Sequence, residues 1–134
     1  MKLYHKIKKS SHTVYDYLTD MQKFVSVHPV ISKMEKLHND SYLVFETLQF
    51  GFIPYSFTYT VTVSSDYMAK RIVINATIIK SAKIQMTFNI NADGAYSIIE
   101  EEVNFKTSLP IKSIMKMIFK KQHETLFKNI ESAK

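Results

Sequence analysis

Glu101, in the stretch AYSIIEEEVNF, is the residue with the clearest potential for chemistry. Strict alternation along a strand places Glu101 on the more apolar face and turns both neighbouring glutamates to water. The other members of that face are Ser97, Ile99, Val103 and Phe105. A buried carboxylate has a raised pKa and can act as an acid or base. Two other arrangements stay open: a bulge that turns Glu101 outward, or a buried ion pair with a lysine.

Gln122 is a second candidate, because its angular position lies near the centre of the apolar face of the last predicted helix. A buried amide needs a hydrogen-bond partner, and leaving it without one costs ~1–3 kcal/mol. Gln122 could orient the polar end of a ligand or bond to a sheet hydroxyl such as that of Tyr59. The alternative is a structural hydrogen bond within the core.

Metal, nucleotide and covalent chemistry have no support in the sequence. Cysteine is absent, and the five histidines (His5, His12, His28, His38 and His123) include no pair spaced as in H-x-x-x-H or H-E-x-x-H. There is no G-x-S-x-G segment and no phosphate-binding loop. We therefore predict no metal site and no cofactor.

The basic charge comes almost entirely from lysine. The net charge is +6, and Arg71 is the only arginine. Because specific nucleic-acid contacts favour arginine or a recognised motif, we predict no specific nucleic-acid partner. Lys112, Lys116 and Lys120 recur at a spacing of four, which disfavours a helix by ~0.2–0.5 kcal/mol per pair. They form either a solvated face or a peripheral contact with an anionic membrane.

Rows of aromatic residues and methionines are the last feature with functional potential. The side chains expected to face one another across a sheet and a helix are Phe57, Tyr59, Met86, Phe88, Met115 and Phe119. Each could simply be core, but as a set they could line an apolar cavity, because methionine adapts to irregular shapes.

The elements that would position these residues begin with a strand at 2–9, followed by a helical corner. Ser10 or Ser11 can cap a helix whose apolar face holds Val14, Tyr17, Leu18 and Met21. A second short turn is predicted over 22–27, and Pro29 disfavours helix at His28.

The rest of the chain is predicted to form successive strands, followed by a final helix. Further strands are predicted over 31–37, 42–50, 55–63, 70–79, 83–92 and 95–107. Pro110 is predicted to open a helix that runs to about Ser132. Its apolar face centres on Ile111, Met115, Ile118 and Leu126, with Ile114, Phe119 and Ile130 at the flanks.

This order predicts a single α+β domain over residues 1–134. Strands with one apolar and one polar face are typical of an antiparallel sheet with one wet side. About seven strands would curve around the long C-terminal helix, with the two short helices after the first strand. The space between sheet and helix is a natural place for a ligand.

The opening segment resembles that of the START/birch-pollen-allergen/polyketide-cyclase (SRPBCC) superfamily, which has the helix-grip fold. The matching residues are Val14, Tyr15, Leu18, Asp20, Pro29 and Ile31. Tyr15 stands where many members have tryptophan, and the glycine-rich loop of the plant allergens is missing, so the likeness is to small bacterial members. The resemblance implies that the helical corner plugs one end of the sheet and that the ligands are hydrophobic or amphipathic. It places His28 near the opening of the cavity, although this residue could simply end the helix.

Three functions remain open. The first is a carrier of a hydrophobic small molecule such as a lipid or polyketide, with Phe57, Tyr59, Met86, Phe88, Ile99, Glu101, Met115, Phe119 and Gln122 as candidate ligand contacts. The second is a cyclase-, aromatase- or hydratase-like enzyme in which Glu101 or a tyrosine moves protons. The third is a protein-interaction module like the family members that activate a heat-shock ATPase. With no signal-like segment and no membrane-length apolar run, we expect a cytoplasmic protein.

Overall fold

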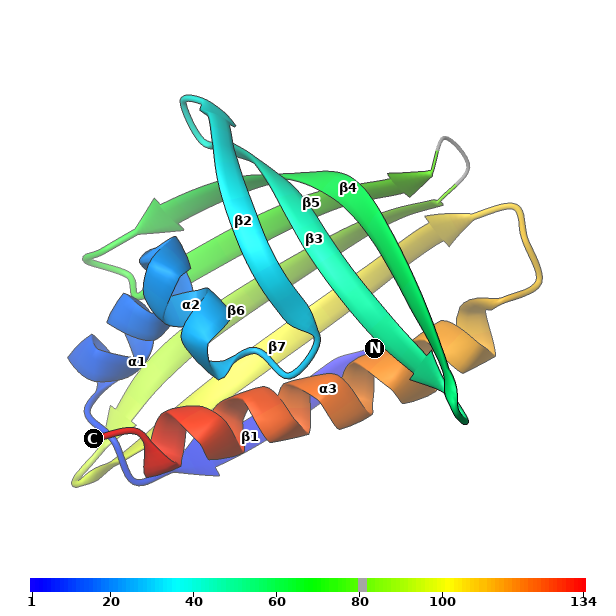
Figure 1. Cartoon of the computed structure of the whole chain (residues 1–134). Helices are drawn as coiled ribbons and strands as arrows, with labels where there is room; N and C mark the ends of the chain where they lie inside the picture. Colours follow the sequence, from blue (N-terminus) through cyan, green and yellow to red (C-terminus); the bar gives the residue numbers. More distant parts are fainter. Residues whose placement is uncertain (80–81) are drawn as a thin grey trace.

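The computed structural model describes residues 1–79 and 82–134, which form a seven-stranded sheet, two short helices and one long helix (Figure 1). In chain order the elements are β1 (Lys2–Ile7), α1 (Ser11–Thr19), α2 (Met21–Val27), β2 (Ile31–His38), β3 (Ser41–Phe50), β4 (Ile53–Asp66), β5 (Arg71–Ile79), β6 (Ala82–Asp93), β7 (Tyr96–Thr107) and α3 (Lys112–Ser132).

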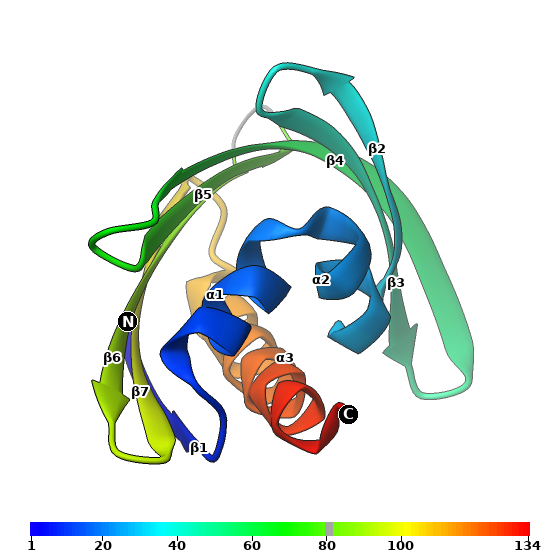
Figure 2. The same cartoon turned by 90° about the vertical axis from the view of Figure 1, so that its left-hand side faces the viewer.

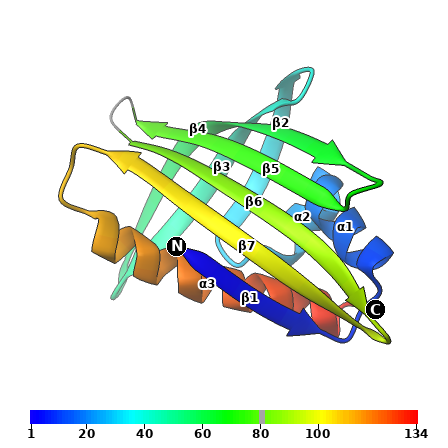
Figure 3. The same cartoon turned by 180° about the vertical axis from the view of Figure 1, so that it is seen from behind.

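The sheet has the order β1-β7-β6-β5-β4-β3-β2, and each neighbouring pair is antiparallel. Figure 2 shows that it curves around α3 and the α1–α2 corner, and Figure 3 shows its convex side, which none of α1, α2 and α3 covers. The predicted fold class, a curved antiparallel sheet wrapped on the C-terminal helix, is confirmed.

The concave face carries the apolar residues of the alternating strands. Along β7 the buried positions alternate with exposed ones, and they are Ser97, Ile99, Glu101, Val103 and Phe105. Glu101 therefore lies inside, 1% exposed, and no bulge turns it outward. Opposite the sheet, α3 buries His123, Leu126, Phe127 and Ile130.

Capping side chains determine where α1 and α2, which form the helical corner, begin and end. Ser10 Oγ accepts a hydrogen bond from the Thr13 amide at 3.1 Å, which caps α1. Asp20 ends α1 and caps α2, because its carboxylate accepts from the amides of Gln22 and Lys23. The corner is fastened to the last helix where Asn129 Nδ2 donates to the Val27 carbonyl at 2.8 Å.

The start of α3 differs from the prediction. Its helical residues begin at Lys112 rather than at Pro110, because residues 107–111 form local hydrogen bonds instead of a first helical turn. The Leu109 amide donates to Thr107 Oγ1 and the Ile111 amide to the Leu109 carbonyl. The expected apolar face is also only partly buried, since Ile114 remains 55% exposed.

No helix within the described residues is both long enough and apolar enough to span a membrane.

Candidate functional site

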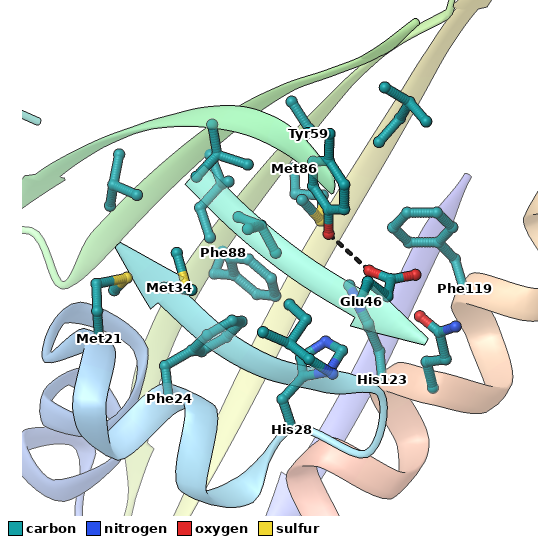
Figure 4. A pocket seen from close by; sticks show the side chains of 18 residues that line it. Met21, Phe24, His28, Met34, Glu46, Tyr59, Met86, Phe88, Phe119 and His123 are labelled. Carbon is teal, nitrogen blue, oxygen red and sulfur yellow. Dashed lines mark hydrogen bonds between the residues drawn. The ribbon is translucent and has the colours of Figure 1, made fainter. Parts of the chain in front are cut away.

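An apolar pocket lies between the concave face of the sheet, α2 and α3 (Figure 4). Its apolar lining residues are Met21, Phe24, Ile31, Met34, Val44, Val61, Val63, Ile74, Ala76, Ile78, Met86, Phe88 and Phe119. Its polar lining residues are His28, Glu46, Tyr59, Gln122 and His123. A mainly apolar wall with a few polar groups is typical of a small-molecule site.

Glu46 and Tyr59 form a hydrogen-bonded pair at this pocket. The register of β3 and β4 pairs Glu46 with Phe57 and Val44 with Tyr59, so Glu46 and Tyr59 are diagonal neighbours on the concave face. The Tyr59 hydroxyl donates to Glu46 Oε1 at 2.6 Å. Burial raises the pKa of Glu46, although the bond from Tyr59 opposes that effect. Burial also raises the pKa of Tyr59, and the Glu46 carboxylate adds to the increase.

His28 is both the C-cap of α2 and a wall of the pocket. Its Nδ1 accepts hydrogen bonds from the amides of Val30 at 3.3 Å and Ile31 at 3.2 Å. Burial, reinforced by the neighbouring His123, lowers the pKa of His28 to about 3. The ring is therefore neutral near pH 7, with its proton on Nε2.

Glu101 lies between two histidines behind the pocket wall. His5 Nε2 of β1 donates to its Oε1 at 3.1 Å, and His123 Nδ1 of α3 donates to its Oε2. Burial would raise the pKa of Glu101, but attraction to His123 and the bonds from both imidazoles outweigh it and lower the pKa. The carboxylate is therefore ionised, and both its partners are histidines rather than the lysine considered from the sequence.

The free space in the pocket is small. Its cavity volume is about 40 Å³, which holds on the order of three water molecules. A larger ligand requires side chains to move, and Met21, Met34 and Met86 are the lining residues best able to do so. Within residues 1–79 and 82–134, no group of three or more histidine, aspartate or glutamate side chains is arranged to hold a metal ion.

The candidate contacts named from the sequence fall into two groups. Tyr59, Met86, Phe88, Phe119 and Gln122 all line the pocket. The others, Phe57, Ile99, Glu101 and Met115, lie outside its lining: Phe57 stacks on Tyr59, Ile99 is core, Glu101 is behind His123, and Met115 packs against the core. The Tyr59 hydroxyl, considered as a partner for Gln122, donates to Glu46 instead. The binding role of every candidate stays a prediction.

Sequence reasoning missed two polar residues of the pocket, Glu46 and His123. The sequence could have indicated Glu46, because it lies two residues after Val44 in β3 and therefore points to the same, concave face. The sequence signal for His123 was weaker. His123, Phe127 and Ile130 share a helical face at spacings of four and three, but this face is rotated from the apolar face predicted for the helix.

Solved structures with this fold include a START superfamily protein from Mycobacterium smegmatis, 14% identical with a TM-score of 0.80, with 98% of this chain and 93% of that chain covered. Ara h 8.0201 is 13% identical with a TM-score of 0.79 and the same coverage. The Zhui aromatase/cyclase from Streptomyces sp. R1128 is 9% identical with a TM-score of 0.74, covering 97% of this chain and 89% of that one. These likenesses show the fold.

A search of curated proteins found no match. The family model for CoxG, a carbon monoxide dehydrogenase component, matches residues 5–133, nearly the whole chain. Together with the START-type architecture, this match shows that the chain belongs to the CoxG family of the SRPBCC superfamily.

Proposed function

We propose that this protein binds and carries a hydrophobic small molecule that has one neutral, hydrogen-bonding end. The observation that supports this most directly is the apolar pocket whose few polar residues lie at the end of α2 and on β3, β4 and α3. In Figure 4, Glu46, Tyr59 and His123 lie close together, and Met21 lies further along the pocket. His28 lies between Phe24 and His123, with ring centroids 5.2 Å and 6.4 Å away.

The electrostatics of the polar end favour a neutral ligand group such as a carbonyl or hydroxyl. His28 is neutral near pH 7, because its pKa is about 3. The ionised Glu101 carboxylate lies directly behind His123, and Glu46 adds a further carboxyl group at the pocket. An anionic ligand would therefore meet negative charge, and the described lining residues include no lysine or arginine to offset it.

Binding of two fluorescent probes tests the proposal. We expect the neutral probe aminoanthracene to bind at least tenfold more tightly than the anionic anilinonaphthalene sulfonate, a difference of about 1.4 kcal/mol. Ala76→Leu, which fills the pocket, should weaken binding of the neutral probe, because Ala76 is a buried lining residue. The control Ala69→Leu lies in an exposed turn and should bind as the wild type does.

Equal binding by Ala76→Leu and the wild type would contradict the proposal and favour a protein-interaction module. Mass spectrometry of an organic extract of the purified protein then identifies any ligand that copurifies. A reaction product of that ligand formed on incubation would favour the enzyme alternative.

We further propose that the ligand is exchanged at an anionic membrane. The tip of the β3–β4 hairpin exposes Phe50, Phe52 and Ile53, and Phe52 is 102% exposed. The first half of α3 exposes Ile114 and Met117 beside Lys112, Lys116 and Lys120. Both segments lie at the same end of the molecule in Figures 1 and 3. Exposed apolar side chains next to lysines suit a surface of anionic lipid.

A further inference from the structure

We propose that the polar end of the pocket is also a proton-transfer site, in which His123 is the general base, Glu101 positions it, and His28 holds the oxygen of a carbonyl substrate. The inference rests on the proposed pocket being open to a small molecule. Its starting point is the set of contacts that hold His123.

Glu101 determines which nitrogen of His123 carries the proton. An ionised carboxylate can only accept hydrogen bonds, so His123 Nδ1 must donate to Glu101. His5 donates to the other carboxylate oxygen and packs on Phe127 with ring centroids 4.2 Å apart, so Glu101 is held from both sides. In its neutral form the His123 ring therefore has a free lone pair on Nε2.

The proposal requires that lone pair to face the free space of the pocket. Among the described residues, every fully buried side-chain nitrogen or oxygen has a hydrogen-bond partner. The same residues provide no partner for His123 Nε2, so this atom is not fully buried. His123 is only 3% exposed overall and lines the pocket, and the proposal places its Nε2 toward the cavity.

His28 supplies a hydrogen-bond donor, whereas His123 supplies an acceptor. Because its Nδ1 accepts two backbone hydrogen bonds, its Nε2 carries a proton and can donate. The His28 and His123 rings have centroids 6.4 Å apart at 83°. Both rings line the same pocket, so the proposed substrate lies in the cavity beside them, with its oxygen at His28 and the neighbouring carbon at His123.

The chemistry that follows is enolisation. His123 Nε2 takes the proton from the carbon next to the carbonyl, and the C–H electron pair becomes the C=C bond. The C=O π pair moves to the oxygen, which accepts a hydrogen bond from His28 Nε2. The buried Glu101 carboxylate stabilises the imidazolium that forms. His123 then returns the proton to the same carbon, or to a conjugated carbon in an unsaturated ketone, so no other reactant is needed.

Hydrogen–deuterium exchange of butanone tests the proposal. In D₂O, the wild-type protein should exchange the protons next to the carbonyl at least about tenfold faster than His123→Gln, since a positioned base contributes about 10²-fold or more. Glu101→Gln should slow exchange, because it removes the charge that stabilises the imidazolium. His38→Gln, at an exposed position on β2, should exchange at the wild-type rate.

Two further measurements keep the test decisive. Long-range proton–nitrogen NMR of the wild type should find that the neutral form of His123 carries its proton on Nδ1 and not on Nε2; the reverse tautomer would overturn the proposal. Butanone should also shift the methyl signal of Met86, which reports entry into the pocket.

If the Met86 signal shifts but wild type and His123→Gln exchange at equal rates, proton transfer is refuted and the carrier function stands. If butanone leaves every pocket signal unchanged, the premise of an open pocket fails and the proton-transfer proposal falls with it.

Discussion

The buried Glu101 carboxylate connects three elements, β7, β1 and α3. It is 1% exposed on β7, and its two partners come from β1 and α3. Removing water from a carboxylate is unfavourable unless hydrogen bonds and opposite charge replace it. Here two imidazoles do so, and the result is a histidine of fixed orientation in the wall of the pocket.

His28, Glu101 and Glu46 have shifted pKa values, and these shifts do not all change the stability of the protein in the same direction with pH. The lowered pKa of His28 contributes stability that is present above about pH 6.5 and is lost as pH falls toward 3. The lowered pKa of Glu101 acts in the same sense at lower pH, below about 4.5. The raised pKa of Glu46 acts oppositely, because its contribution is present below about 4.5 and is lost as pH rises.

We predict that His28→Asn flattens the loss of stability between pH 6.5 and pH 5. The wild type must take up one extra proton on unfolding there, which changes the free energy of unfolding by about 1.4 kcal/mol per pH unit. Asparagine keeps an acceptor near the amides of Val30 and Ile31 but does not titrate. Urea unfolding at several pH values measures both slopes; identical slopes would show that His28 titrates normally in the folded protein.

At the scale of elements, α3 divides into two halves with different environments. Its second half buries His123, Leu126, Phe127 and Ile130 against the sheet and the corner. Its first half leaves Ile114 and Met117 exposed, 55% and 68% respectively. The face predicted from helical periodicity is therefore real as a pattern, but the sheet covers only part of it.

We predict that this exposed half and the β3–β4 tip bind anionic vesicles. Replacing Lys112, Lys116 and Lys120 with glutamine should weaken binding to vesicles of phosphatidylglycerol and phosphatidylcholine about 100-fold, at ~1 kcal/mol per lysine. Phe52→Ser should weaken it as well, because it removes the most exposed aromatic side chain of the tip. Cosedimentation of protein with vesicles measures both effects.

The matched control carries the same change of charge at other exposed lysines, Lys33, Lys36 and Lys128. It should retain most of the binding. If both triple variants lose binding equally, net charge alone attracts the protein, and the proposed docking segment is refuted.

At the scale of the whole molecule, segments that are far apart in the sequence are joined. β1 pairs with β7, and the N-terminal amine of Met1 donates to the Val103 carbonyl at 2.9 Å. The Ser97 hydroxyl donates to the Lys9 carbonyl at 2.7 Å, and α3 is fastened to α2 through Asn129. Segments from the start, middle and end of the chain thus depend on one another.

We predict that residues 1–134 unfold as one cooperative domain. Urea transitions followed by far-UV circular dichroism and by tyrosine fluorescence should coincide. Ile130→Ala, in the fully buried part of α3, should shift both transitions together and lower the free energy of unfolding by about 2–5 kcal/mol. Transitions that separate would reveal an independently stable part and contradict the single domain.

The predictability of the candidate site differs from residue to residue. The inward position of Glu101 follows from alternation along β7, and Tyr59, Met86 and Phe88 were placed on the concave face in the same way. Gln122 and Phe119 follow from the helical period of α3. Phe57 and Ile99 share the inner surface but lie outside the pocket lining, because periodicity gives the face of a residue and not its distance along the sheet.

The sequence by itself determined the order of the elements, the helical corner and the inner face of each strand, since these depend on capping residues and on periods of two and 3.6 residues. Tertiary structure alone decided that His5 and His123, 96 and 22 residues from Glu101, meet its carboxylate, and that the pocket retains only about 40 Å³. The physical reason is that a local sequence pattern controls only which way a side chain points. Contacts between distant segments and the volume of the cavity depend on how the sheet curves and on how side chains pack within it.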